Sequence, residues 1–388
     1  MPPAHTTTRA LAFRYAAFYG AVFLAVGIYQ PFWPVFLKSR GLSAAEIGLI
    51  FALTSWIRIA TGPAIAQIAD RSGRAKATLA VVAALCLVIS TGFFPAQGFW
   101  PILLVMLPAS VCFQPMIPLI ESQTMTAVRR ERLDYGRIRL WGSLTFILGT
   151  VGAGALISGR APDLVLFLVL GALALTLLAA LALPAAPARR LDVASFNPLN
   201  LLRDRRFLLF LGAAGLIQAS HAVYYGFSAL HWQAAGLSEA TIGWLWAEGV
   251  AVEVLLFAFS GAAMARAGPA ALLVLAALAG ILRWTVLATS TDLAPLIAVQ
   301  ALHALTFGAA HLGAMHFIAR TAPPGLEATA QSLYSAVSGG LAMGLAMLLA
   351  GALYDAAAGQ AFLAMTALST AGLGLALVLW RFGGREVR

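Results

Sequence analysis

Several ionisable residues fall inside stretches of this chain that are otherwise apolar. Among them are Arg58, Glu121, Arg139, Glu248, Glu253, Arg283, His303 and His311. Moving a charge from water into an apolar span is costly, so such residues are candidates for binding or proton transfer. Glu121 and Arg139 flank a short polar connection, which places them at similar depth. Because an arginine fork can hold both oxygens of a carboxylate, these two residues form a candidate binding pair.

Glu253, Arg283 and His303 form a second candidate group, suited to proton transfer. Helix rise places Glu253 and Arg283 at roughly the same depth in their apolar stretches. A neighbouring cation favours the charged carboxylate, so Glu253 could exchange a proton as Arg283 moves. A static ion pair is equally compatible with the sequence.

Aromatic and polar side chains accompany these charges. Gln218, His221 and Tyr225 are spaced at i, i+3 and i+7, so they share one face of a helix. Together with tyrosines of the first apolar stretch (Tyr15, Tyr19 and Tyr29) they could line an aromatic cavity with polar tips. A buried arginine in such a cavity suits a carboxylate on an aromatic body. Trp33, Trp100 and Trp232 lie near the ends of apolar stretches, where we expect an interfacial belt.

The composition predicts a membrane protein. Hydrophobic residues make up 61% of the 388 residues and charged residues 10%, against about 45–50% and about 25% in soluble proteins. If both termini are on the cytoplasmic side, nearly all the Lys and Arg residues outside the spans lie on that side too. The basic residues on the opposite face are only Lys38, Arg40 and Arg160. This asymmetry follows the positive-inside rule and accounts for the net charge of +10 without a nucleic-acid partner. We therefore expect a multi-pass protein of a bacterial-type cytoplasmic membrane, and a monomer.

Twelve apolar stretches are each long enough to cross a ~30 Å hydrocarbon layer as a helix. They lie near residues 10–37, 44–68, 76–95, 100–127, 136–158, 163–185, 207–231, 240–264, 268–289, 293–319, 326–353 and 358–381. A polar stretch separates the sixth from the seventh. The sequence thus predicts an all-α fold with six-helix bundles at 1–186 and 207–388, joined by a cytoplasmic linker at 187–206.

The chain also repeats itself at an offset of 195 residues. Residues 41–48 recur as 236–243 with six identities in eight, and the same offset pairs Tyr29 with Tyr224 and Gly73 with Gly268. Parallel repeats of this kind are typical of membrane transporters. We expect the halves to be pseudo-symmetric about an axis along the membrane normal, with the substrate cavity between them.

The loop after the second apolar stretch reads Ala66-Gln-Ile-Ala-Asp70-Arg71-Ser-Gly73-Arg74-Ala-Lys76. It resembles the cytoplasmic signature of the major facilitator superfamily, and the second half keeps a decayed copy from Gly261 to Gly268. The resemblance implies that Asp70, Arg71, Gly73 and Arg74 form a conformational latch. Gly73 would permit the tight turn that the loop needs.

Two branches of that superfamily resemble the chain further. Glu121 and residues 134–142 resemble the fourth and fifth spans of lactose permease and its relatives. This implies substrate binding by Glu121, Tyr135, Arg139 and Phe146, while Thr306 stands where that branch carries its proton-bearing glutamate. The phenylpropionate permease family resembles the chain along nearly its whole length, including residues 221–229, Arg283-Trp284 and Leu302-His303. The shared helix face adds Gln218, His221 and Tyr225 to the expected substrate site, and the resemblance at Leu302-His303 adds His303.

The sequence therefore predicts a secondary active transporter that takes up a small aromatic carboxylic acid with a proton by alternating access. Sugar or nucleoside symport is the alternative within transport. A non-transporting sensor or an intramembrane enzyme is the alternative of another class, but no His-Glu-x-x-His run, Gly-x-Ser-x-Gly elbow or nucleotide loop occurs. We expect no cofactor and no metal, because no His, Cys and Asp spacing suggests a metal site.

Overall fold

The computed structural model describes residues 4–184, 198–259, 266–323 and 326–383, and helices account for nearly all of them. Their contacts divide the chain into two compact units. Unit 1 comprises Met1–Leu42, Ile57–Val193 and Ser238–Ala247, and unit 2 comprises Ser43–Trp56, Ala194–Leu237 and Glu248–Arg388. Residues 187–197 of the predicted linker lie outside the described residues, and the division into two six-helix domains stays a prediction.

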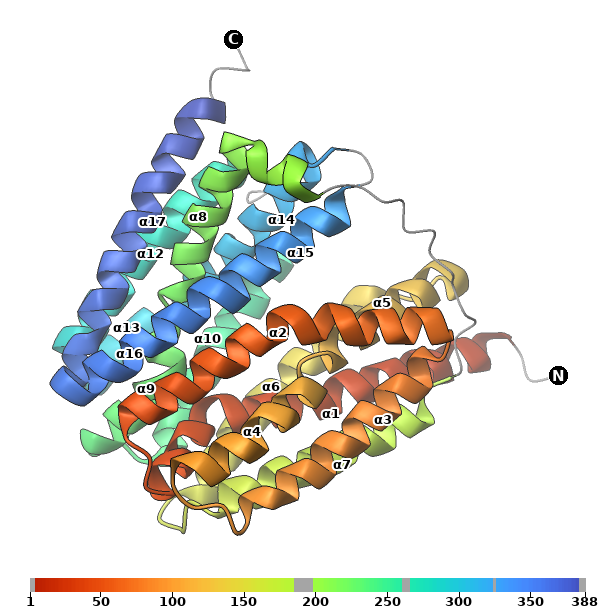
Figure 1. Cartoon of the computed structure of the whole chain (residues 1–388), viewed down its shortest axis with the longest axis horizontal. Helices are drawn as coiled ribbons and strands as arrows, with labels where there is room; N and C mark the ends of the chain where they lie inside the picture. The colour runs from red at the N-terminus through yellow and green to blue at the C-terminus, as the bar shows by residue number, and fades with distance from the viewer. Residues whose placement is uncertain (1–3, 185–197, 260–265, 324–325, 384–388) are drawn as a thin grey trace. The chain divides into compact units, whose positions relative to one another are not determined.

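Unit 1 is built mainly from the helices of the first half of the chain (Figure 1). These are α1 (Ala4–Ser39), most of α2 (Ala44–Ser72), α3 (Ala75–Ser90), α4 (Phe99–Phe113), α5 (Met116–Glu131), α6 (Tyr135–Ile157) and α7 (Leu164–Ala182). The first part of α10 (Glu239–Phe259) also belongs to this unit. Helix α1 packs along both α6 and α7 and so holds these helices together within the unit.

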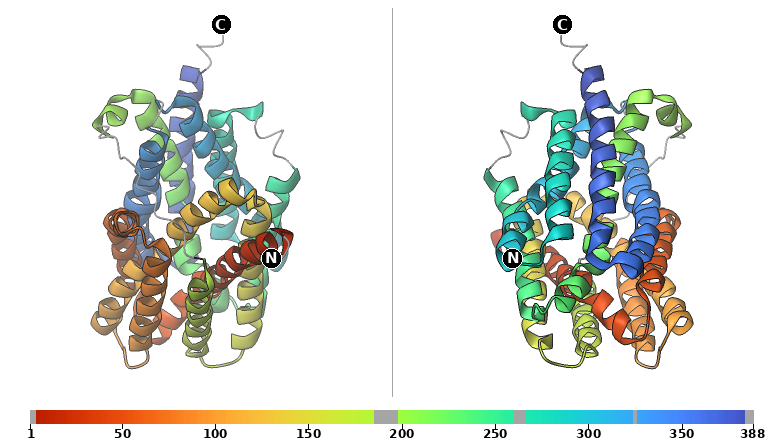
Figure 2. Two further views of the ribbon diagram at one scale, coloured as in Figure 1. Left: turned by 90° about the vertical axis from the view of Figure 1, so that its right-hand side faces the viewer. Right: turned by 90° about the vertical axis from the view of Figure 1, so that its left-hand side faces the viewer.

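Unit 2 contains the remaining helices, several of which are broken within one span. They are α8 (Arg205–Ala219), α9 (Ala222–Ala234), α12 (Pro269–Thr289), α13 (Leu293–Gln300), α14 (Ala310–Thr321), α15 (Glu327–Ser335), α16 (Met343–Ala357) and α17 (Phe362–Gly383). Two π-helical segments, η3 (Ala304–Ala309) and η4 (Ala336–Ala342), continue α13 into α14 and α15 into α16. Helix α17 packs between α12 and α8, as the two views of Figure 2 also show.

The predicted spans are confirmed within a few residues. Eleven helical runs among the described residues are long and apolar enough to cross a membrane, and the last of them covers Thr329–Phe382. That 54-residue run turns back at Ala358, whose φ of 46° lies in the left-handed region. The turn separates α16 from α17, and counting these two helices separately gives twelve spans among the described residues, consistent with the prediction.

The repeat is visible in the backbone. Helix α1 ends at a turn in which Gly41 has a φ of 87° and the amide of Leu42 donates to the carbonyl of Leu37. In α9 the same turn recurs, with Gly236 at a φ of 89° and Leu237 donating to Trp232. Both glycines occupy a conformation that side chains disfavour, which explains why the repeat retains them.

Glycines let α1 and α6 approach closely. Ideal Cβ atoms added at Gly27 and Gly149 would overlap the backbone carbonyls of Phe146 and Leu24 respectively. Apolar side chains give no net driving force between helices in lipid, so such small-residue contacts carry much of the association. This packing holds the aromatic face of α1 against the polar residues at the start of α6.

We predict that Gly27→Ala destabilises unit 1, because its methyl group would meet the backbone of α6 rather than a side chain that can move aside. Overpacking of this kind costs about 1–3 kcal/mol. Gly152→Ala is the matched control, since nothing lies within 4 Å of the added Cβ on α6. Thermal unfolding of the purified variants measures both, and equal midpoints for the two would contradict the role of Gly27.

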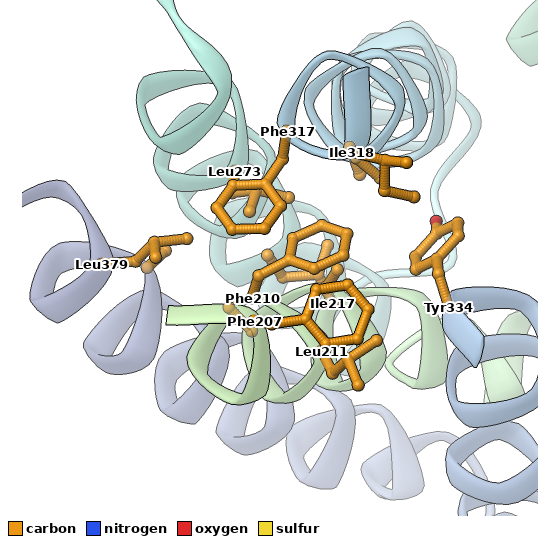
Figure 3. Close-up of a cluster of buried hydrophobic side chains, with 14 of the residues drawn as sticks. Phe207, Phe210, Leu211, Ile217, Leu273, Phe317, Ile318, Tyr334 and Leu379 are labelled. Atoms are coloured by element: carbon orange, nitrogen blue, oxygen red, sulfur yellow. The ribbon is translucent and has the colours of Figure 1, made fainter. Parts of the chain in front are cut away.

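The core of unit 2 is apolar and aromatic. Phe210 of α8 stacks on Phe317 of α14 at a centroid distance of 4.2 Å, and Tyr334 and Leu379 close the cluster (Figure 3).

The prediction of an interfacial belt is wrong for two tryptophans. Trp33 and Trp232 are 1% and 0% exposed and pack inside the protein, whereas Trp100 is 70% exposed.

Candidate functional site

In unit 1 the carboxylate of Glu121 is held by two tyrosines. The Tyr19 hydroxyl on α1 donates to Oε2 at 2.9 Å, and the Tyr135 hydroxyl on α6 donates to Oε1. All three side chains are at least half-buried. The sequence placed these residues in one site, and the structure brings them together at the position where α1, α5 and α6 meet.

Arg139 lies one turn after Tyr135 on α6 and pairs with aromatic rings. Its Cζ atom is 4.1 Å from the ring centroid of Phe23 and 5.6 Å from that of Tyr19, a cation–π arrangement. Among the described residues no ion pair joins Arg139 to Glu121, and Tyr19 connects the two. The direct Glu121–Arg139 contact therefore stays a prediction. Among the residues that the structure describes, no hydrogen bond occupies the guanidinium donors of Arg139, so they are available for an anion.

In unit 2 the centre of the polar network is Arg283 on α12, which is completely buried. Its guanidinium donates to Gln300 Oε1, to His303 Nδ1 at 3.1 Å and to Thr306 Oγ1 at 3.1 Å. The ring of Tyr224 lies 4.4 Å from the same Cζ atom. The ring of Trp284 lies 4.8 Å from it as well, so five polar or aromatic partners among the described residues share one buried cation. They offset part of its desolvation cost.

Breaks in the helices position the partners of Arg283. His221 stands at the junction of α8 and α9, where Ser220 and His221 interrupt the span. Its Nδ1 atom lies 3.2 Å from the carbonyl oxygens of both Ile217 and Gln218, one turn earlier in the chain. Its Nε2 atom lies 3.2 Å from Thr306 Oγ1. His303 directly precedes the π-helical segment η3, and such segments are frequent at functional sites.

The hydrogen-bond partners determine how His303 is protonated when neutral. Arginine only donates, so Nδ1 of His303 must accept from Arg283. The ring hydrogen then lies on Nε2, which is 3.5 Å from Oε2 of Glu253 on α10. His303 is therefore placed between Arg283 and Glu253, and the structure brings together the three residues predicted for proton coupling.

The other predicted residues lie around these two groups. Tyr225 stacks on His221 at a centroid distance of 5.4 Å, and Phe146 is buried on α6. Tyr15 is buried, and Tyr29 stacks on Trp33. Within the described ranges several buried side-chain atoms of unit 2 have no hydrogen-bond partner, among them Gln218 Oε1, Gln300 Nε2 and Arg283 Nε. Buried polar atoms left in this way usually bind water or a ligand.

The predicted latch forms a tight turn between α2 and α3. Gly73 has a φ of 64°, and its amide donates to the carbonyl of Asp70 at 3.2 Å. The side chains of Asp70, Arg71 and Arg74 are exposed. Gly261 and Ala265 of the decayed second copy lie outside the described residues, but Gly268 has the matching φ of 78°. The turn is confirmed, and its action as a latch stays a prediction.

Sequence reasoning missed two ring partners: Phe23 lies over the half-buried Arg139, and Tyr224 lies over the buried Arg283. Phe23 follows Tyr19 at i+4, so both rings occupy one face of α1. That spacing could have indicated a cation–π site once Arg139 was placed at a similar depth.

Comparison with known proteins identifies the family of this chain. The model of the MFS_1-like family matches residues 12–364. A probable 3-phenylpropionic acid transporter of Escherichia coli (strain K12) is 35% identical over 353 residues, covering 90% of this chain and 92% of the relative. A maltose permease of Geobacillus stearothermophilus is 29% identical over 350 residues, covering 87% and 86%. The crystal structure of nucleoside transporter NupG superposes with a TM-score of 0.84 at 16% identity, covering 95% and 99%.

The family model, the 35% identical relative and the eleven membrane-length helical runs among the described residues define a multi-pass transporter of the inner membrane. The chain belongs to the MFS_1-like family of the major facilitator superfamily. The resemblance to phenylpropionate permeases is thereby confirmed. The relatives and the fold are those of transporters, which are not enzymes.

Proposed function

We propose that this protein takes up a small aromatic carboxylic acid of the phenylpropionate type together with a proton. The observation that supports it most is Arg139, a half-buried guanidinium lying over the Phe23 ring. Within the described residues its carboxylate neighbour Glu121 is bonded to tyrosines instead. A carboxylate could take both donors of the fork while an aromatic body packs against the neighbouring rings.

The relatives support the same substrate class, since the 35% identical protein is described as a probable 3-phenylpropionic acid transporter. Sugar or nucleoside uptake is the second candidate, favoured by the identity to a maltose permease and to a putative nucleoside transporter. In our proposal Glu121 is less suited to a sugar, because both of its oxygens already accept hydroxyl hydrogens.

Arg139→Lys tests the proposal. Lysine keeps the charge but loses the planar fork, so we expect uptake of radiolabelled 3-phenylpropionate to fall tenfold or more while the protein still folds. A hydrogen bond to a charged group contributes about 1.5–3 kcal/mol. The loss of one such bond therefore corresponds to a tenfold or larger fall in affinity. Arg160→Lys, an exposed residue after α6, is the matched control and should transport normally.

Thermal shifts of the purified protein identify the substrate class, because a ligand of the folded state raises apparent stability. We expect 3-phenylpropionate to shift the midpoint and 3-phenylpropanol, which lacks the carboxylate, to have little effect. A shift with maltose or uridine alone would replace the aromatic acid with the second candidate. Normal uptake by Arg139→Lys would remove Arg139 from the binding site.

Proton coupling, in this proposal, uses Glu253 and His303, with Arg283 holding the histidine ring. Both termini lie in the cytoplasm, as the distribution of arginines indicates. We further propose that the substrate-binding residues are those predicted from the sequence: Glu121, Tyr135, Arg139, Phe146, Gln218, His221, Tyr225 and His303. The predicted latch at residues 70–74 contributes to alternating access. We also propose that the protein acts as a monomer.

A further inference from the structure

A groove of about 380 Å³ lies at the beginning of α1 and α6 in unit 1, apart from the residues proposed for transport. Arginines and aromatic residues line it together: Arg9 and Phe13 on α1, Arg132 after α5, and Arg137 and Trp141 on α6. Phe13 is 73% exposed and Trp141 54% exposed. Large aromatic side chains this exposed beside arginines suit a ligand that has both a charge and an apolar part.

The same spacing occurs on both helices. Phe13 follows Arg9 by four residues, and Trp141 follows Arg137 by four residues. Four residues of helix rise by about 6 Å, so each aromatic ring lies one turn deeper in the span than its arginine. The groove therefore has a cationic rim and an aromatic floor that faces the apolar part of the span.

The rim carries more positive than negative charge. Asp134 is the acidic residue of the groove, and it is already engaged at the start of α6. Its Oδ1 accepts from the amide of Arg137 at 3.1 Å, and its Oδ2 lies 3.7 Å from Nε of the same residue. Among the described residues no ion pair involves Arg9 or Arg132. These two cations are available to an external anion.

The apolar part of the groove continues along the outer face of α6. Leu144 and Leu148 follow Trp141 on that face and are 46% and 63% exposed. In a membrane this face contacts acyl chains, whereas Tyr135 and Arg139 lie on the opposite face of the helix with Phe23 and Glu121. A ligand in the groove thus has its charged end at the rim and its apolar end toward the lipid.

We propose that this groove binds the headgroup of an anionic phospholipid, with the phosphate at Arg9 and Arg132 and the upper acyl chain on Phe13 and Trp141. Basic pockets between spans on the cytoplasmic side attract such headgroups, at about 1 kcal/mol per arginine near the surface. The charge of the rim and the continuous apolar face both match a phospholipid better than a soluble anion.

Lipid titrations of the full chain in neutral detergent, read by native mass spectrometry, test the proposal. We expect phosphatidylglycerol to bind more tightly than phosphatidylcholine, and Arg9→Gln with Arg132→Gln to weaken phosphatidylglycerol binding by about thirtyfold. The matched control is Arg129→Gln with Arg130→Gln, which removes the same charge from the end of α5 outside the groove. Phe13→Ala with Trp141→Ala should weaken binding of both lipids.

Arg9→Lys with Arg132→Lys keeps both positive charges and should retain the preference for phosphatidylglycerol. This variant distinguishes loss of charge from misfolding as the cause of weaker binding in the glutamine variant. Equal affinity for the two lipids, or an equal loss in the control pair, would overturn the proposal. So would inorganic phosphate that binds with the same dependence on Arg9 and Arg132, because the site would then take a soluble anion. Loss of 3-phenylpropionate binding in Arg9→Gln with Arg132→Gln would instead assign the groove to the transported acid.

Discussion

Glu253→Gln is expected to abolish proton-driven accumulation of substrate while leaving exchange of substrate between the two sides intact. Oε2 of Glu253 faces Nε2 of His303 at 3.5 Å, where a carboxylate can take up and release a proton. The amide of glutamine preserves the size and polarity of the side chain but cannot carry that proton. Proteoliposomes separate the two activities: accumulation under an imposed pH gradient should vanish, and counterflow at equal pH should persist.

His303→Gln provides the comparison for this result. It should impair binding more than coupling, because Arg283 would lose the ring that lies between it and Glu253. Accumulation that survives Glu253→Gln but disappears in His303→Gln would reverse the assignment. Accumulation in both variants would exclude both as obligatory carriers and make Glu121 the next residue to test.

Arg283→Lys should eliminate transport and also lower thermal stability. A single ammonium group cannot replace the fork that reaches Gln300, His303 and Thr306 from the centre of unit 2. Any of these acceptors that lose their donor stay buried, and each such group costs about 1–3 kcal/mol. Thermal unfolding of the purified protein and uptake in the same preparation measure the two effects.

Arg381→Lys, an exposed residue at the end of α17, is the matched control for this substitution and should leave both properties unchanged. A variant Arg283→Lys that unfolds at the wild-type temperature would show that the buried network contributes no net stability. Stability without transport, by contrast, would assign Arg283 to the transport cycle alone.

The spans could be predicted from the sequence because hydropathy and helix length are strongly constrained in a bilayer. The turns at Gly41 and Gly73 could also be predicted, since glycine in a repeated position indicates a backbone that needs a positive φ. The orientation of each helix about its own axis could not be predicted from the sequence. Lipid is as apolar as a protein core, so hydropathy could not show that Trp33 and Trp232 point inward.

The same limit applied to the candidate site. Sequence spacing identified Glu121, Arg139, Glu253 and Arg283 as buried charges, but it paired each carboxylate with an arginine. In the structure tyrosines hold Glu121, and His303 stands between Glu253 and Arg283. Such partners depend on the rotation of each helix about its axis, which leaves no periodic signal in an apolar stretch.

The π-helical segment η3 has a consequence for how this chain tolerates insertions and deletions. A π turn holds one residue more than an α turn, so a single deletion within Ala304–Ala309 can be absorbed by closing the segment into an ordinary α-helix. The same deletion inside α12 would turn every following side chain by about 100°. Length changes of one residue should therefore be found beside His303, the position where the helix can change its winding without losing its span.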